Sequence, residues 1–232
     1  MYQPPHFQET RQEILHGLVR AHPLGLLISN GAQGGAEGPI ANAIPFLLDA
    51  PSLPNADVPP KGRLRAHLAK ANPQWRLLAD NPLSPVLVVF QGADAYVTPS
   101  WYETKRETGK VVPTWNYAIV QVRGMVRVIE DGDWLAQQIS DLTVSQEGGR
   151  EAPWAVTDAP PAFIQSQIKG IIGLEIEISD ISGKWKVSQN RPAADRIGVA
   201  EGLESEGTTA GEGSTASDMA RMVRSWGGLD SK

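Results

Sequence analysis

The sequence predicts a mainly β fold with flanking helices, of the α+β class, built around a closed or nearly closed antiparallel barrel. About six strand-like segments follow one another in hairpin-like succession, while helical segments are few and lie at the margins. This order argues against alternating β-α units and favours a barrel. At 232 residues and 41% hydrophobic composition, the chain is long and apolar enough to bury a substantial core.

The first half of the chain begins with an amphipathic helix over 9–23, which ends at Pro23 because proline cannot continue a helix. Short apolar or alternating runs then predict strands, and Pro45 marks an edge or a bulge in the second of them. Gly-rich residues 31–38 and Pro-rich residues 50–62 are expected to be loops. The strands expected here cover 24–30, 39–49 and 63–68, and a short helix covers 72–82.

The second half continues with a buried strand, a Gly-Ala-Asp turn at 92–94 and a further strand. The longest strand pattern contains Gly124, which we expect at a bulge or bend. The elements expected here are strands over 84–92, 94–99, 113–130 and 169–190 (the last as one or two strands) and helices over 131–149, 160–168 and 192–203.

The C-terminal segment differs in composition from the rest of the chain. From about residue 205 the sequence turns to Gly, Ser, Thr, Ala and Glu. We therefore expect one domain over 1–203 and a disordered acidic and small-residue tail over 204–232, in which 217–226 forms at most a short helix.

Composition also narrows the functional classes. Without cysteine, thiol catalysis, disulfides and thiolate metal sites are excluded. The four histidines show no metal-ligand spacing, and no phosphate loop or serine nucleophile motif is present, so we expect no metal. With no signal peptide pattern and no apolar run of spanning length, we expect a cytoplasmic protein without a membrane partner. Residues 61–123 carry a net charge of +5 against −10 for the remainder, which suits a small anion better than a long duplex.

The stretch HLAKANPQW, residues 67–75, joins a predicted strand to a predicted helix. Lys70 lies in the turn, and Asn72 with Pro73 is placed to begin the helix, whose free amide groups would face back toward the loop. Cations and helix amides together suit a phosphate. Taken singly, each residue has a simpler structural role as a cap, a solvated cation or a core tryptophan.

Two further stretches are rich in groups that bind ligands. Residues 95–117 interleave aromatic, hydroxyl and cationic side chains between two strands, which is typical either of a packed loop over the barrel mouth or of a pocket wall that stacks on a planar ligand. Single-stranded nucleic acid is disfavoured by the acidic net charge. Residues 182–190, SGKWKVSQN, form either a polar exit from the sheet or a set of hydrogen-bond donors for a ligand.

These three stretches, with YQPPHF and NAIPFLLD, closely resemble the PaiB family of FMN-binding negative transcriptional regulators. The resemblance covers about residues 1–203 in the same order. It implies a split antiparallel β-barrel of the FMN-binding type, like that of pyridoxamine-phosphate oxidases, and a homodimer with FMN near the subunit interface. DNA enters as a partner through the family resemblance alone.

The resemblance also implies the residues that bind the cofactor. The turn after the strand corresponds to the segment that holds the FMN phosphate and ribityl chain, and the second strand runs beside the flavin ring. The phosphate end is assigned to His67, Lys70, Ala71, Asn72 and Trp75; the ring to Ala43, Ile44, Pro45 and Phe46; and a second rank to Thr114, Trp115, Asn116, Gln189 and Asn190.

Three functions stay open at this point. The chain is a flavin-binding regulator that senses a redox state or a small molecule, a flavin-dependent oxidoreductase on the same kind of barrel, or a barrel that has lost its cofactor and acts through its dimer surface. The fold does not choose among them, because function depends on the site.

Overall fold

The structure is a computed structural model that describes residues 1–31, 38–51, 58–210 and 215–229. The predicted loops 31–38 and 50–62 lie partly outside the described residues, at 32–37 and 52–57. The strands are β1 (Gln8–Glu9), β2 (Leu24–Ser29), β3 (Ile40–Asp49), β4 (Arg63–Ala69), β5 (Val86–Val97), β6 (Thr114–Ile129) and β7 (Ile171–Lys186). The α-helices are α1 (Gln12–Ala21), α2 (Gln74–Asp80), α3 (Glu103–Thr108), α4 (Gly132–Glu147), α5 (Pro161–Lys169), α6 (Ala193–Ala210) and α7 (Thr215–Gly227).

The seven strands form one sheet in the order β1-β7-β4-β3-β2-β5-β6, and β6 also pairs with β7. That additional pairing closes six of the strands into a ring, with β1 added to β7 outside it. The β2–β3, β2–β5, β3–β4 and β4–β7 pairs are all antiparallel. The predicted α+β fold with an antiparallel barrel is confirmed.

Close contacts divide the chain into two compact units. Unit 1 comprises Met1–Leu18, Gln91–Val120 and Ser182–Lys232, and unit 2 comprises Val19–Phe90 and Gln121–Ile181. Strands β5, β6 and β7 each contribute residues to both units. We describe the two units separately.

In the strands of unit 2, successive side chains alternate between the barrel interior and its outer side. In β4, Leu64 and Ala66 are fully buried, whereas Arg63, Arg65 and His67 between and beside them are half-buried. This alternation follows from the two-residue period of a strand. The side chains that fill the interior include Leu27, Ile44, Phe46, Leu64, Leu68, Val88, Phe90, Ile172, Leu174 and Ile176.

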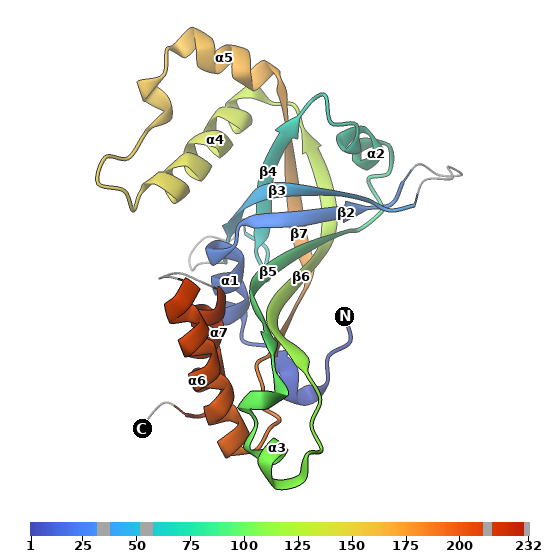
Figure 1. Cartoon of the computed structure of the whole chain (residues 1–232). Helices are drawn as coiled ribbons and strands as arrows, with labels where there is room; N and C mark the ends of the chain where they lie inside the picture. Colours follow the sequence, from blue (N-terminus) through green and yellow to red (C-terminus); the bar gives the residue numbers. More distant parts are fainter. Residues whose placement is uncertain (32–37, 52–57, 211–214, 230–232) are drawn as a thin grey trace. The chain divides into compact units, whose positions relative to one another are not determined.

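Helix α4 lies against the outer side of β4, next to α5 (Figure 1). Arg65 fixes this contact, because its guanidinium donates two hydrogen bonds of 2.8 Å to Asp49 and a third of 2.8 Å to Asp141 of α4. Burial disfavours the charge of Arg65, yet the hydrogen bonds to both carboxylates raise the pKa of the guanidinium above its usual value.

Unit 1 packs α6 against α7 (Figure 1) and places Trp101 against α6. Gly198 is required at that contact, because a Cβ there would lie 2.0 Å from the carbonyl oxygen of Trp101. Asp195, fully buried in the first turn of α6, accepts hydrogen bonds of 2.9 Å from the amide and the hydroxyl of Thr104. The Arg191 guanidinium lies over the ring of Tyr102, 4.6 Å from its centroid, and burial raises the pKa of the Tyr102 hydroxyl.

The tail differs from the expectation of disorder over 204–232. Helix α6 continues to Ala210, and residues 215–227 form α7, in which Met219, Ala220 and Val223 are buried. These apolar residues fall on one helical face, a pattern that average composition does not reveal. Trp226 of α7 stacks on Trp185, with ring centroids 6.0 Å apart.

A second difference concerns the turn expected at 92–94. Strand β5 runs without interruption from Val86 to Val97. A Cβ at Gly92 would lie 3.0 Å from Leu18 and 3.5 Å from Ala118. This glycine therefore permits a close approach within a strand and does not form a turn. No helix within the described residues has the length and hydropathy needed to cross a bilayer.

Candidate functional site

The turn between β4 and α2 keeps its shape mainly through the side chains of the NPQW sequence. The Asn72 side-chain oxygen accepts a hydrogen bond of 3.0 Å from the Gln74 amide, and the Trp75 indole donates one of 2.9 Å to the carbonyl of Lys70. The N-cap position of α2 is occupied by Pro73, one residue after Asn72, which the sequence predicts as the start of the helix. Because Asn72 already binds a helix amide and α2 has only seven residues, the helix terminus offers little to an anion.

Gln74 is the residue of this turn that sequence reasoning missed. It is fully buried, and its amide nitrogen donates to Ser29 Oγ at 3.1 Å and to the carbonyls of Leu27 and Ile40 at 3.3 and 3.4 Å. Its side-chain oxygen accepts a 2.9 Å hydrogen bond from Asn42. Gln74 thus joins α2 to β2 and β3, a role that no local sequence signal separates from that of an exposed glutamine.

Lys70 is the cation of the turn that remains available. Its backbone amide donates to the carbonyl of Gly170 at 2.9 Å, which fixes the position of the residue. Its side chain is half-buried and, within the described residues, has no ion pair or side-chain hydrogen bond. The neighbouring Ala71 is exposed. The turn therefore presents one uncompensated positive charge in a partly desolvated position.

His67 lies on the outer side of β4, and α4 holds its ring. The ring Nδ1 lies 2.7 Å from the side-chain oxygen of Gln138, which is fully buried and whose amide nitrogen has no hydrogen-bond partner in the part of the chain that the structure describes. The opposite orientation of the amide group would give that nitrogen a partner, with Gln138 donating to Nδ1. In that arrangement the Nε2 atom of a neutral His67 carries the proton, so that Nε2 can donate a hydrogen bond to an anion.

The four predicted ring-contact residues of β3 divide between two sides of the strand. Ala43 and Pro45 are exposed on the outer side, whereas Ile44 and Phe46 are 3% and 2% exposed. Phe46 packs edge-on against Phe90 with ring centroids 5.8 Å apart, so it belongs to the interior. The side chains of Ala43 and Pro45 are the ones that can contact a ligand outside the barrel.

Apolar side chains of three adjacent strands continue this outer side. Leu24 pairs with Pro45, and Leu26 pairs with Ala43 on β3 and with Val89 on β5. Leu24 and Leu26 are 63% and 40% exposed. We call this surface the outer apolar face; its members are Leu24, Leu26, Ile28, Ala41, Ala43, Pro45, Leu87 and Val89.

The second-rank candidates lie in unit 1, where two of them have structural partners. Asn116 is buried and exchanges hydrogen bonds of 3.0 and 3.2 Å with Ser188, which has a left-handed backbone at φ 65°. The Gln189 side chain binds the backbone amide of Val187 at 2.8 Å and the carbonyl of Trp185. These two side chains hold the turn after β7. Thr114 is half-buried, and Trp115 and Asn190 are exposed.

The same part of unit 1 contains a cavity of about 580 Å³, which is within the range of ligand pockets. Two of its segments belong to the stretches 95–117 and 182–190 that the sequence predicts as possible ligand-binding surfaces, and the third is the N-terminal YQPPHF. The lining residues are Tyr2, Pro4, His6, Phe7, Thr114, Trp115, Tyr117, Lys184 and Lys186.

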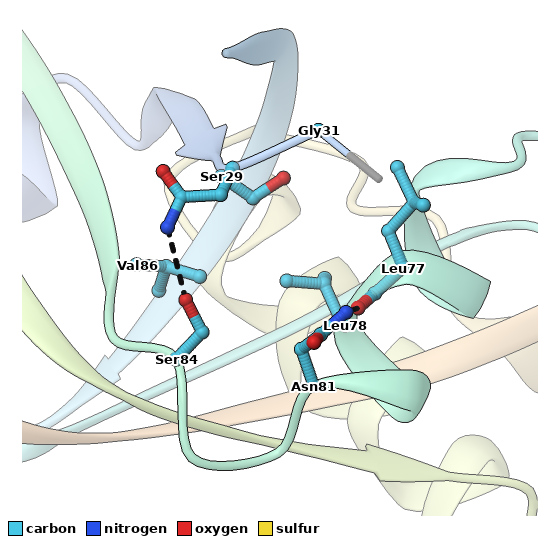
Figure 2. A pocket seen from close by; sticks show the side chains of 8 residues that line it. Ser29, Gly31, Leu77, Leu78, Asn81, Ser84 and Val86 are labelled. Atoms are coloured by element: carbon cyan, nitrogen blue, oxygen red, sulfur yellow. Dashed lines mark hydrogen bonds between the residues drawn. The ribbon is translucent and has the colours of Figure 1, made fainter. Parts of the chain in front are cut away.

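Unit 2 has a smaller cavity beside α2 and the end of β2. Figure 2 shows Ser29, Leu78 and Val86 around it, with a hydrogen bond of 3.1 Å from Asn30 to Ser84 at its rim. Its volume of about 80 Å³ is too small for a flavin ring. Among the residues that the structure describes, no group of three His, Asp or Glu side chains could hold a metal.

Comparison with known proteins finds one matching family model and several similar sequences. A family model described as "Putative FMN-binding domain" matches residues 1–180. The chain is 37% identical to an uncharacterized protein of Aspergillus fumigatus, over 97% of both chains. It is 31% identical to protease synthase and sporulation protein PAI 2 of Bacillus subtilis, over 96% of both chains.

Solved structures share the fold at low sequence identity. A conserved hypothetical protein of Mycobacterium tuberculosis matches with a TM-score of 0.54 at 13% identity, over 83% of this chain and 94% of that one. The FAD and heme binding protein of Mycobacterium smegmatis matches with a TM-score of 0.52 at 20% identity, over 77% and 73%. These likenesses support the barrel architecture.

Proposed function

Since the chain belongs to the PaiB-type family of FMN-binding domains, we propose that it binds FMN on the outer side of unit 2 and acts as a flavin-dependent regulator in the cytoplasm. The observation that carries the site is Lys70, a partly desolvated cation whose side chain has no partner among the described residues, three residues after the half-buried His67. FMN supplies reversible electron transfer through its ring, and the protein supplies binding and surroundings.

The phosphate is proposed to bind at Lys70 and His67. A dianion needs charge-assisted donors, and the Lys70 ammonium has its three N–H groups free of partners in the described residues. Gln138 orients the His67 ring by the 2.7 Å contact, so that Nε2 can act as a donor. The turn itself is held in shape by Asn72, Gln74 and Trp75, which therefore support phosphate binding indirectly.

The ring is proposed to lie on the outer apolar face beside Ala43 and Pro45. An exposed apolar surface of this kind marks a ligand or protein interface. We propose that a second copy of the chain covers it, which gives a homodimer with the flavin at the interface. The flavin site proposed here does not include Thr114, Trp115 or Asn190, which lie in unit 1.

FMN affinity tests the phosphate site directly. For the Lys70→Met variant we expect FMN to bind about 10- to 100-fold more weakly, because one charge-assisted contact is lost. Riboflavin, which has no phosphate, should bind the variant and the wild type with nearly equal affinity. Titration followed by flavin fluorescence measures both ligands.

The matched control is Lys61→Met. Lys61 is an exposed lysine just before the first residue of β4, and its ammonium donates to the carbonyl of Ser179. The variant should bind FMN as the wild type does. If Lys70→Met loses riboflavin and FMN equally, the phosphate assignment is wrong. If the wild type binds no flavin, the proposed function is wrong.

The regulatory role is supported by 31% identity to the sporulation protein of Bacillus subtilis. The alternative, a flavin-dependent oxidoreductase on the same kind of barrel, stays open because the fold does not distinguish the two functions. For the regulator, we expect NAD(P)H to bleach the flavin slowly and without catalytic turnover. In a gel-shift experiment, we expect specific retardation of DNA that changes when the flavin is reduced. Rapid catalytic turnover of NAD(P)H without specific retardation of DNA would favour the oxidoreductase. The molecular mass of the same preparation in solution tests whether the chain is a dimer.

A further inference from the structure

We propose that the cavity of unit 1 binds a second, separate ligand: a planar aromatic compound that carries a carboxylate or a phosphate. The lining of the cavity combines two lysines with four aromatic side chains of Phe, Tyr and Trp that the flavin phosphate site does not use. The residues that carry the inference are Lys184, Lys186, Tyr2, Trp115 and Tyr117.

Lys184 is the main reason to expect an anion. The residue is 8% exposed, and its side chain, which lines the cavity, has no hydrogen bond or ion pair within the described residues. Its ammonium lies 5.4 Å from the ring centroids of both Tyr2 and Tyr117, which stabilises the charge without neutralising it. A buried cation without a counterion is costly, so an anionic ligand would relieve an existing cost.

Lys186 adds a second charge to the same wall. Its ammonium donates to Thr114 Oγ1 at 2.5 Å and to the carbonyl of Trp115, which leaves one N–H group for a ligand. Burial lowers the pKa of Lys186, and the charges of Lys184 and Arg191 lower it further. The described residues that line the cavity include no carboxylate. Glu9, on the strand that pairs with β7 here, is hydrogen-bonded to Arg11.

The remaining lining specifies a flat ligand. Trp115 is 54% exposed and Tyr2 is 82% exposed, so both rings have free faces at the cavity. Trp115 is held by an edge contact with Tyr96, with ring centroids 5.9 Å apart. Exposed aromatic rings beside desolvated cations bind planar anions by combining stacking with charge.

Calorimetric titration of the full chain tests this proposal with three probes that share one ring. They are 4-nitrobenzoate, 4-nitrophenyl phosphate and the neutral 4-nitrobenzyl alcohol. We expect at least one anion to bind at least 10-fold more tightly than the alcohol, and the stronger of the two identifies carboxylate or phosphate as the recognised group. Saturating FMN should leave the affinity unchanged.

Variants separate the charge from the aromatic wall. Lys184→Met should lower affinity for the anion about 10-fold or more and leave the weak binding of the alcohol unchanged. Lys184→Arg should restore anion binding, and exposed Lys110→Met should have no effect. Trp115→Ala should weaken all three probes. The thermal midpoint of Lys184→Met should equal or exceed that of the wild type, because a buried unpaired charge is removed.

Three results would overturn the proposal. The first is equal affinity for the anions and the alcohol, or no binding of any probe. The second is unchanged anion binding in a folded Lys184→Met variant. The third is displacement of the bound anion by FMN, which would make the cavity part of the flavin site.

Discussion

The Gln74→Ala variant should lose about 3 kcal/mol of unfolding free energy, one of the two largest stability effects that we expect in this chain. The substitution leaves the Asn42 amide and the carbonyls of Leu27 and Ile40 without their buried partner. It also opens a cavity where a fully buried side chain lay. Chemical denaturation followed by circular dichroism should show a lower midpoint.

The Gln137→Ala variant is a control in the same unit. Gln137 is exposed on α4 and donates a hydrogen bond of 2.6 Å to Asp141. Its loss should cost less than about 0.5 kcal/mol, as is usual for surface substitutions. If Gln74→Ala is as stable as this control, the buried network does not hold α2 to the barrel.

The contrast between Lys70 and Gln74 indicates what sequence reasoning could predict about the site. The pattern HLAKANPQW and its resemblance to a family drew attention to the turn, and its role in binding a ligand stays a prediction. Burial, which decides whether a polar side chain binds a ligand or the protein itself, depends on residues far away in the sequence. Gln74 binds β2 and β3, more than 30 residues before it, whereas Lys70 has no such partner.

The fold was more predictable because strand alternation is a local signal. The pattern of β4 alone predicts which residues face the interior, and the structure agrees. Prediction was wrong where two distant segments decide the outcome. Gly92 permits contact with Leu18 and Ala118 and does not form a turn, and α7 is ordered by packing that composition cannot reveal.

The stability of unit 1 should depend on pH through Glu9. This carboxylate is 5% exposed and accepts hydrogen bonds from the backbone amides of Thr10 and Arg11, from the Arg11 guanidinium and from the Trp226 indole. The hydrogen bond from the Arg11 side chain is the largest influence, and together with the others it lowers the pKa of Glu9 from 4.5 to about 2. The charged form is therefore favoured in the folded state.

A carboxylate with a lowered pKa stabilises the fold above the pKa of the unfolded chain. The contribution is complete above about pH 5, and protonation removes it as the pH falls from 4.5 toward 2. The shift corresponds to about 3 kcal/mol, and we expect about 2 kcal/mol because Arg11 is 57% exposed and its charge is screened. Glu9→Gln should be destabilised by that amount at pH 7.

The difference between Glu9→Gln and the wild type should shrink as the pH is lowered and vanish near pH 2. Thermal unfolding at several pH values measures it, and Glu13→Gln, at an exposed site on α1, should show no such trend. Because Glu9 also binds Trp226, amide exchange in α7 should accelerate in the Glu9 variant at pH 7. A constant difference across the pH range would mean that Glu9 acts through packing and not through its charge. Unchanged exchange in α7 would mean that the hydrogen bond from Trp226 to Glu9 does not help to hold the helix.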